Sequence, residues 1–344
     1  MDDAAVDEYD NYDNLTTFNT TLDYSDWSPG EYEMDPGNYY ENIMQKTSIT
    51  LFSIVFALGI IGNGLVIWIA GFRMNNTISA VWFLHLAIAD FLCCTSLPLR
   101  IAEWAAGFVD SAHCTVNMFL FNVNMSASVL LLTAMSIDRW VSVMWPFWAK
   151  VHRSRNLVRI SAAIIWGLSV TVASALYYVY RYHVRYLLEW CLYYHYTFRY
   201  NPELLQTMQW IRLVIMCVIP FLIIVTSYVT IFYKLRKSKR SQRSQRSSRI
   251  ITAVISCFFI CWFPYYIGPP IFWIYGIYIA SYYPFHSAFY TVSTITTSLA
   301  CLNSCLNPII YVLMTPDFQQ GFLRSIPSRI ERALGDHPND LCGE

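Results

Sequence analysis

Long apolar stretches, separated by short polar segments, dominate the sequence from residue 47 to residue 314. A helix needs about 20 apolar residues to cross the hydrocarbon core of a bilayer, and each stretch reaches that length. Charged or turn-forming residues bound each stretch and so mark its ends. The pattern therefore predicts seven membrane-spanning helices, near residues 47–72, 79–103, 114–144, 156–180, 204–234, 249–277 and 285–314.

The composition supports a membrane environment. Apolar residues make up 56% of the chain and charged residues 13%, whereas a typical soluble domain has about 45–50% and about 25%. A soluble protein needs more charge than this to cover its surface. We therefore expect an all-α membrane protein, a seven-transmembrane helix bundle, with an outer tail at 1–46, a membrane domain at 47–314 and a cytoplasmic segment at 315–344.

The charged residues are segregated along the chain, although the net charge is zero. Twelve acidic residues lie within residues 1–41, and eight basic residues lie between Lys234 and Arg249. Lys and Arg concentrate in the short cytoplasmic loops of membrane proteins. With the N-terminus outside, 17 of the 23 Lys and Arg residues fall on the cytoplasmic side. We therefore expect a multi-pass protein of the plasma membrane with its N-terminus outside. Its surroundings are membrane lipids, and we expect no nucleic-acid partner.

The outer tail carries candidate modification sites. Asn14 and Asn19 each begin an Asn-x-Thr acceptor for N-glycosylation. Tyrosines stand among the tail acids and are candidates for sulfation: Tyr9, Tyr12, Tyr24 and Tyr32. An acidic flexible tail can attract a basic protein ligand electrostatically, although acidic runs are also common in segments that are simply solvated.

Several polar residues lie inside the predicted spans, where an unsatisfied polar group is costly. Asp90 is in the middle of the second span, the third carries Asn117, Asn122, Asn124 and Ser128, and the seventh carries Asn303, Ser304 and Asn307. We expect these groups to face one another inside the bundle. They could simply join the helices by hydrogen bonds, or they could hold a monovalent cation at Asp90, because hard cations prefer oxygen ligands.

Short motifs recur in order along the seven spans: Gly62-Asn63, Leu86-Ala-Ile-Ala-Asp90, Asp138-Arg139-Trp140, Trp166, Pro220 with Tyr228, Cys261-Trp262-Phe263-Pro264 and Asn307-Pro308-Ile-Ile-Tyr311. With these motifs the chain resembles a rhodopsin-like (class A) G-protein-coupled receptor along nearly its whole length. Trp140 replaces the family's tyrosine, but the charged pair before it is intact.

The resemblance implies an activation mechanism. Arg139 pairs with Asp138 at rest and is released toward the G protein, Tyr228 and Tyr311 when the sixth helix swings outward. Pro264 and Pro308 remove helix hydrogen bonds and so provide hinges. Trp262 lies one turn below the expected ligand pocket, although a buried Trp can also serve packing alone.

The resemblance also implies two further features. A sodium ion, the single cofactor-like ligand that we expect, would be held by Asp90, Asn124, Ser128, Asn303 and Asn307 and would favour the resting state. A disulfide would join Cys114 at the top of the third span to Cys191 in the second outer loop.

Three segments resemble the leukocyte chemoattractant subgroup, which contains receptors for formyl peptides, complement anaphylatoxins and chemerin. They are Ala70-Gly71-Phe72-Arg73-Met74, the inner-loop motifs Pro146-Phe-Trp148 and His152-Arg153-Ser154, and a stretch from Asn303-Ser304-Cys305-Leu306-Asn307-Pro308 to Ser325-Ile326-Pro327-Ser328-Arg329-Ile330-Glu331-Arg332-Ala333-Leu334. Membership implies chemotaxis, an extracellular peptide or protein ligand and an inhibitory-class G protein.

In this subgroup an Arg two turns outside the fifth-span proline receives an anionic ligand group, and here that residue is Arg212. Its planar fork suits a carboxylate, although an Arg near a helix end can also extend to the interface. Arg100 and Arg181 are further basic candidates. Three positions depart from the subgroup's ligand-binding pattern, and they are Asn122, Met208 and Ser293. The acidic tail and Arg212 together predict a ligand that is basic overall with an anionic C-terminus.

The C-terminal segment is predicted to form a short amphipathic helix, because Phe318, Phe322 and Ile326 recur every four residues. No hydroxyl residue lies beyond Ser328, so no cluster of phosphates can form there, and we expect weak arrestin recruitment.

Two alternatives remain. A scavenger receptor with the same fold would not signal, but such receptors often lose the Arg that stands here as Arg139. A transporter or channel would show internal repeats and broken helices, which the sequence lacks. No catalytic or metal-ligand motif indicates an enzyme.

Overall fold

The structure, a computed structural model, describes residues 36–73, 77–106, 111–183, 202–237, 252–268, 271 and 283–314. The chain divides into two compact units, Met1–Tyr40 and Glu41–Glu344. Of the first unit, only the opening residues of helix α1 (Pro36–Trp68) are described. The second unit holds the remaining helices, and everything below concerns this unit.

The helices follow the predicted order, and the predicted all-α class is confirmed. After α1 and a short π-helix, η2 (Ile69–Arg73), come α2 (Ile78–Ala106), α3 (Ser111–Met144), α4 (Pro146–His152), α5 (Arg155–His183), α7 (Pro202–Leu213), the π-helix η4 (Val214–Val218), α8 (Ile219–Lys237), the helix Thr252–Gly268 and α10 (Tyr283–Met314). The three segments α7, η4 and α8 together form the predicted fifth span. The short helix α4 lies between the predicted third and fourth spans, where the apolar pattern predicts no helix.

Among the described residues, five helices are long and apolar enough to cross a membrane, and Thr252–Gly268 is a shorter apolar helix. The exposed side chains of α1 show how such a helix meets lipid. Ile54, Leu58, Ile61, Leu65 and Trp68 are all exposed and recur at steps of three or four residues. They form one apolar stripe along the helix. Asn63 on the same helix is buried instead, and the exposed hydroxyl of Ser53 donates to the carbonyl of Ile49 one turn earlier.

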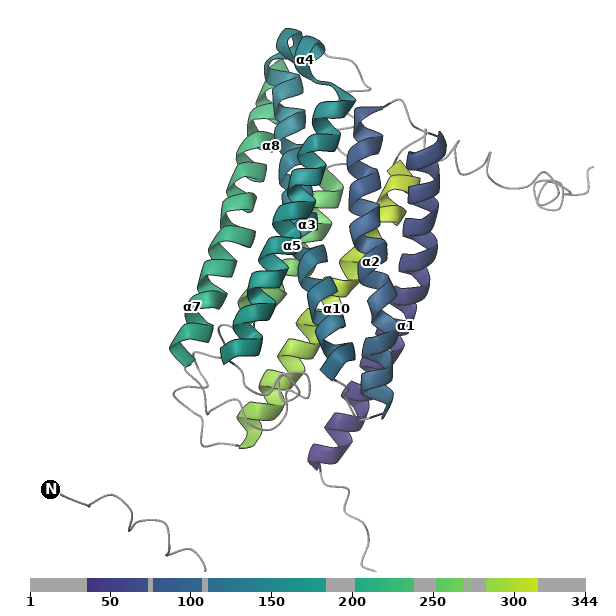
Figure 1. The fold of residues 1–344 in the computed structure, drawn as a ribbon, viewed down its shortest axis with the longest axis vertical. Helices are drawn as coiled ribbons and strands as arrows, with labels where there is room; N and C mark the ends of the chain where they lie inside the picture. The colour runs from purple at the N-terminus through teal and green to yellow at the C-terminus, as the bar shows by residue number, and fades with distance from the viewer. Residues whose placement is uncertain are drawn as a thin grey trace, which may run out of the picture. The chain divides into compact units, whose positions relative to one another are not determined.

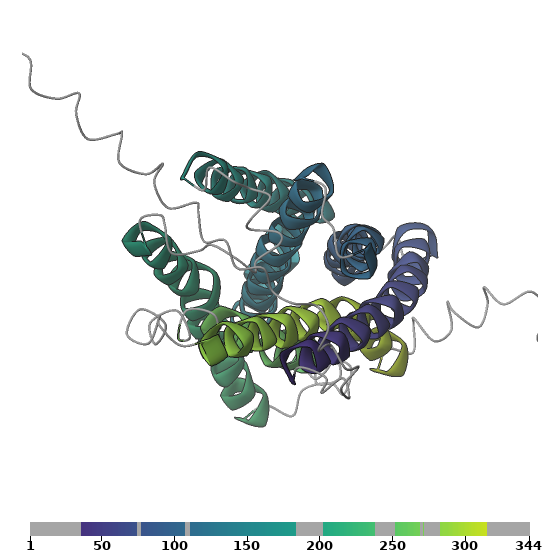
Figure 2. The ribbon, with the colours of Figure 1, turned by 90° about the horizontal axis from the view of Figure 1, so that it is seen from below.

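Helix α3 lies at the centre of the packing, because it contacts α2, α5, α8 and the π-helix η4. Helix α10 packs against α2. Figure 1 shows these helices running alongside one another, with α4 at one end near the junction of α3 and α5. The view at right angles in Figure 2 shows that they stand around one another and do not form a single layer.

Some predicted features lie outside the described residues. They are the tail acceptors Asn14 and Asn19, the tail tyrosines, Cys191 and the C-terminal segment 315–344. The side chains of Cys114, Arg181 and Tyr311 are also outside the description, although their backbones are helical. The disulfide, the amphipathic helix and the tail modifications therefore stay predictions.

Candidate functional site

The polar residues predicted in the spans meet in the middle of the bundle. Asp90 on α2, Asn124 and Ser128 on α3, and Asn303 and Asn307 on α10 are all buried, and together they form what we call the Asp90 cluster. The Asn307 side-chain amide donates to the Asp90 carboxylate at 2.8 Å. The Ser128 hydroxyl donates to Asn124 at 3.2 Å, and the Asn124 amide donates to Ser304 at 3.4 Å. Three helices are thus joined through polar side chains alone.

Several oxygens of the Asp90 cluster have no hydrogen-bond partner among the described residues. They are Oδ1 of Asp90, Oδ1 of Asn303 and Oδ1 of Asn307. A buried carboxylate oxygen without a donor is costly, and a small cation would remove that cost. The donor set fits sodium, which accepts carboxylate and amide oxygens. It does not resemble a transition-metal site, since no group of three or more His, Cys, Asp or Glu residues in the described ranges could hold a metal.

Pro308 explains why α1 approaches α10 beside this cluster. A proline has no backbone N–H, so the carbonyl of Ser304, four residues earlier, loses its helical donor. The Asn63 side chain supplies the missing donor at 2.7 Å, and it also donates to the carbonyl of Gly59. A Cβ atom on Gly62 would lie 3.0 Å from Pro308. The Gly62-Asn63 motif therefore provides both close approach and a hydrogen bond.

Pro220 shapes the fifth span in a similar way. It cannot donate to the residue four positions before it, and the preceding turn widens into the π-helix η4. The backbone N–H of Ile219 donates to Val214, five residues earlier, which is the π-helical spacing. Arg212 lies in the last turn of α7, directly before this widened turn.

Arg212 points into the bundle rather than toward the interface. It is 9% exposed. Its guanidinium lies 2.8 Å from the Met125 sulfur and 3.5 Å from the Tyr265 hydroxyl, and its central carbon is 5.3 Å from the centre of the Tyr265 ring. A cation over an aromatic face is attracted by the ring. Extension to the membrane surface, the alternative interpretation of this Arg, does not fit these contacts.

An aromatic cluster connects Arg212 to the predicted switch residue Trp262. The Tyr265 ring lies 5.8 Å from Trp262, and Phe121 packs on both of them at 5.4 Å. Trp262 is fully buried. A ligand group that moves Arg212 would therefore act on Trp262 through one intervening ring.

The other predicted ligand residues are placed as follows. Asn122 is buried and donates to the Met118 carbonyl at 2.8 Å, while its own oxygen has no partner among the described residues. Arg100, Met208 and Ser293 are half-buried. The sequence did not single out Met125, Tyr265 or Phe121 as neighbours of Arg212, because they belong to apolar stretches with no distinguishing pattern.

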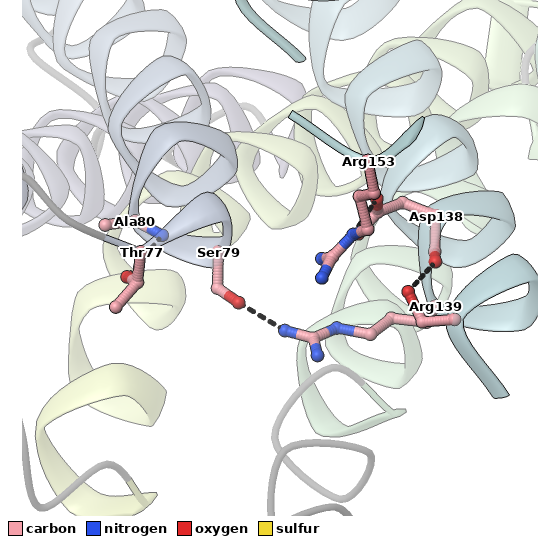
Figure 3. Close-up of polar contacts among 7 residues, drawn as sticks. Thr77, Ser79, Ala80, Asp138, Arg139 and Arg153 are labelled. Atoms are coloured by element: carbon pink, nitrogen blue, oxygen red, sulfur yellow. Dashed lines mark hydrogen bonds and ion pairs between the residues drawn. The ribbon is translucent and has the colours of Figure 1, made fainter. Parts of the chain in front are cut away.

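At the other end of the bundle, the expected pairing of Arg139 with Asp138 is wrong. Asp138 instead forms a bidentate ion pair with Arg153, whose Nε and Nη2 atoms lie 2.6 and 2.5 Å from the two carboxylate oxygens. Arg139 donates to the Ser79 hydroxyl on α2. Figure 3 shows Arg139 extending from α3 toward Ser79, while Arg153 comes from the segment after α4 and lies beside Asp138.

Tyr228, which the resemblance places beside the released Arg139, is half-buried and packs against the core. Its hydroxyl has no hydrogen-bond partner among the described residues. The sequence missed the roles of Arg153 and Ser79. Arg153 belongs to the His152-Arg153-Ser154 motif of the sequence, but this motif does not indicate that Arg153 pairs with Asp138.

Comparison with known proteins gives consistent similarities. Residues 62–311 match the family described as "7 transmembrane receptor (rhodopsin family)". The C3a anaphylatoxin chemotactic receptor of Danio rerio is 33% identical over 346 residues, covering 98% of this chain and 89% of that protein. Chemerin-like receptor 1 of Sus scrofa is 34% identical, covering 84% and 82%, and formyl peptide receptor 2 of Mus musculus is 32% identical, covering 84% and 85%.

Proposed function

Since the chain belongs to the rhodopsin family of seven-transmembrane receptors, in its leukocyte chemoattractant group, we propose that it binds an extracellular chemoattractant peptide or protein and couples to an inhibitory-class G protein. It lies in the plasma membrane with its N-terminus outside. The ligand is basic overall and ends in an anionic group, and arrestin recruitment is weak.

The observation that carries this proposal is the burial of Arg212 beside the aromatic cluster. Bringing a guanidinium into the interior of a membrane protein is costly, and an anionic ligand group offsets that cost with charge-assisted hydrogen bonds. Met125 supplies a weak sulfur acceptor, and Tyr265 supplies its aromatic face and a hydroxyl at 3.5 Å. A carboxylate would be a much stronger partner for the guanidinium than either of them.

The C-terminal carboxylate of a peptide is the anion that fits best. The twelve acids of the first 41 residues can attract the basic part of such a ligand outside the membrane. Its carboxylate end would then enter the bundle and reach Arg212. The aromatic contacts from Tyr265 to Trp262 would pass the change to the sixth helix.

Replacement of Arg212 tests the anionic contact. Loss of a charge-assisted pair in a desolvated site costs about 2–5 kcal/mol. Arg212→Ala should therefore weaken agonist potency roughly 30-fold or more, since each 1.4 kcal/mol is about tenfold. Arg212→Lys should recover part of the loss, because Lys lacks the planar fork. The measurement is inhibition of cyclic AMP by a panel of chemoattractant peptides in cells that express each variant.

Amidation of the peptide's C-terminus completes the test. It should weaken wild-type potency by a similar factor and have little further effect on Arg212→Ala, because both changes remove the same pair. Trp210→Ala, on the exposed face of the same helix, is the matched control and should behave as wild type. Additive effects of amidation and the mutation would mean that the carboxylate meets another residue.

We also propose that sodium binds in the Asp90 cluster as an allosteric ligand. Asp90 would supply the charge, and the amide and hydroxyl oxygens of Asn124, Ser128, Asn303 and Asn307 would complete the shell. The support is the set of buried oxygens without donors. A cation there would favour the helix arrangement that keeps those oxygens close together, which is the resting state.

A further inference from the structure

Helix α4 is held at both of its ends by the Asp138-Arg139-Trp140 triplet of α3. Arg153 is the C-terminal capping residue of α4, and its side chain forms the bidentate ion pair with Asp138. Trp145 precedes the first residue of α4, and its ring packs edge-on against Trp140 with the centres 4.9 Å apart. Two residues of one helical turn thus fix the start and the end of a seven-residue helix.

The ion pair between Arg153 and Asp138 is largely shielded from solvent. The side chains of Arg153 and Asp138 are 21% and 10% exposed. Both carboxylate oxygens of Asp138 accept a hydrogen bond from Arg153. Arg139 is left with the Ser79 hydroxyl, a neutral acceptor. A single bond to a neutral group is weaker than an ion pair, so Arg139 is held lightly in this arrangement.

Helix α4 presents apolar side chains away from the bundle. Phe147 is 88% exposed and Val151 is 78% exposed, and the two lie one turn apart. An isolated seven-residue helix is not stable in water, so tertiary contacts must hold α4 in shape. The Arg153 ion pair and the Trp140 ring are the contacts at its ends.

From this geometry we propose that Arg153 and Trp140 are positioning residues for G-protein coupling. Arg153 keeps α4 ordered and also keeps Asp138 away from Arg139, while Trp140 fixes the start of α4. The coupling half of this inference rests on the proposed function, but the structural half does not. It also gives a reason for the tryptophan that stands where the family has tyrosine.

Replacement of Arg153 should have two separable consequences. The end of α4 loses its anchor, so the helix opens more often. The Asp138 carboxylate loses its bidentate partner and becomes available to Arg139, the nearest cation on its own helix. Both changes oppose coupling, the first by disordering the apolar surface of α4 and the second by restraining Arg139.

Amide hydrogen exchange in the full receptor tests the first consequence. The backbone N–H of Ala149 donates to the Trp145 carbonyl at 2.9 Å and reports directly on α4. In Arg153→Gln this amide should exchange roughly tenfold faster, as expected when a charge-assisted bidentate contact is lost. Arg153→Lys should be intermediate, and Trp140→Leu should raise exchange a few-fold while the ion pair stays. Arg155→Gln removes the same charge two residues later and should leave Ala149 unchanged.

Ligand-free nucleotide exchange on a purified inhibitory-class G protein tests the second consequence. Arg153→Gln should lower the basal rate roughly fivefold, the shift that a moderately exposed charge pair gives a two-state equilibrium. Adding Asp138→Asn to that variant should restore part of the rate while Ala149 stays fast. A residue that mattered only for folding would show no such rescue.

The outcomes separate the two proposals. Ala149 exchange in Arg153→Gln equal to that in Arg155→Gln overturns the positioning of α4. A basal rate that Arg153→Gln does not lower, or that Asp138→Asn does not restore, overturns the role of Arg153 toward Arg139. If the wild-type receptor drives no exchange on any G-protein class, the proposed coupling fails, and Ala149 alone then decides whether α4 is held as we propose.

Discussion

The burial of single polar residues can be predicted where they lie inside a membrane-spanning helix. Asp90 and Asn303 are polar groups in apolar helices, and a bilayer offers them no partner, so burial toward other polar groups was the only satisfactory place for them. The structure buries both of them and joins Asp90 to Asn307 by a hydrogen bond. Arg212 is similar, since its position before Pro220 restricts it to the upper part of the fifth span.

The partner of Asp138 could not be predicted in the same way. Asp138 and Arg139 are adjacent on α3, and the carboxylate can be reached either by this neighbouring side chain or by a basic residue from another segment. Arg153 reaches Asp138 because α4 and the turn after it bring the chain back to the end of α3. The pairing of Asp138 with Arg153 depends on the tertiary structure and cannot be predicted from the order of residues alone.

Sodium sensitivity is the first prediction at the scale of residues. In wild type, sodium should weaken agonist binding, because the ion stabilises the resting arrangement of the Asp90 cluster. In Asp90→Asn the charge that attracts the ion is gone, so potassium and sodium should give the same affinity. The measurement is competition binding of a labelled agonist on membranes as sodium replaces potassium at constant ionic strength.

Ser126→Ala is a suitable control for the sodium experiment. Ser126 is buried on the same helix, between Asn124 and Ser128, but it is not one of the five residues of the Asp90 cluster. This variant should keep the sodium effect. Equal sodium sensitivity in wild type and Asp90→Asn would remove the basis for the site.

At the scale of elements, the apolar pattern located the spans but not their internal geometry. The predicted span 114–144 ends at Met144, as α3 does. The π-helical turns at Ile69–Arg73 and Val214–Val218 were not predicted. A π-helical turn forms when backbone N–H groups bond to the carbonyl five residues earlier instead of four. The hydrophobic pattern of the sequence does not distinguish these two spacings. Helix α4 was missed because seven residues are too few to show a period.

The contact between α1 and α2 yields a prediction about stability. A Cβ atom on Gly59 would overlap the sulfur of Cys94, far inside van der Waals contact. Gly59→Ala should therefore lower the thermal unfolding temperature, since overpacking of a core costs about 1–3 kcal/mol. Adding Cys94→Ala removes the sulfur and should restore most of the loss. Thermal unfolding of the purified receptor in detergent, followed by thiol-reactive dye or scattering, measures both.

Gly167 provides the matched glycine control. Nothing lies within 4 Å of the position of a Cβ atom there. Gly167→Ala should be neutral or raise stability by about 0.5–1 kcal/mol, because Ala favours the helix more than Gly does. If both alanine variants shift the unfolding temperature equally, the close approach at Gly59 is not what limits stability.

At the scale of the whole molecule, the sequence predicted the class of the fold from the number and length of apolar stretches. The match of residues 62–311 to the rhodopsin family agrees with that prediction. Ligand identity is harder to predict, because three positions of the expected binding set, Asn122, Met208 and Ser293, depart from the subgroup's pattern. The contacts of Arg212 therefore define a chemical class of ligand, an anion, rather than one molecule.

Coupling to an inhibitory-class G protein is a prediction about the whole receptor. Pertussis toxin, which blocks that class, should abolish the agonist-driven fall in cyclic AMP. The control is Arg139→Ala, which should also lose the response while surface expression and agonist binding remain. A response that survives the toxin at full size would assign the receptor to another G-protein class.

The orientation of the chain gives the last prediction. The basic residues concentrate in loops that the positive-inside rule assigns to the cytoplasm, with eight between Lys234 and Arg249 alone. The tail before residue 47 then lies outside and passes through the compartment where glycans are added. Asn14 and Asn19 should both be modified. A glycosidase that removes N-glycans should therefore shift wild-type receptor from cells to a faster-migrating band.

Two sequence controls make the orientation test specific. Asn14→Gln combined with Asn19→Gln should migrate as the deglycosylated protein and no longer respond to the enzyme. Asn75 begins another Asn-x-Thr acceptor, but it follows the first span and faces the cytoplasm in the predicted orientation. Asn75→Gln should therefore leave the glycan pattern unchanged. If Asn75→Gln abolishes the shift while the tail double variant keeps it, the chain is inserted the other way round, because the glycan-adding enzymes act on one side of the membrane alone.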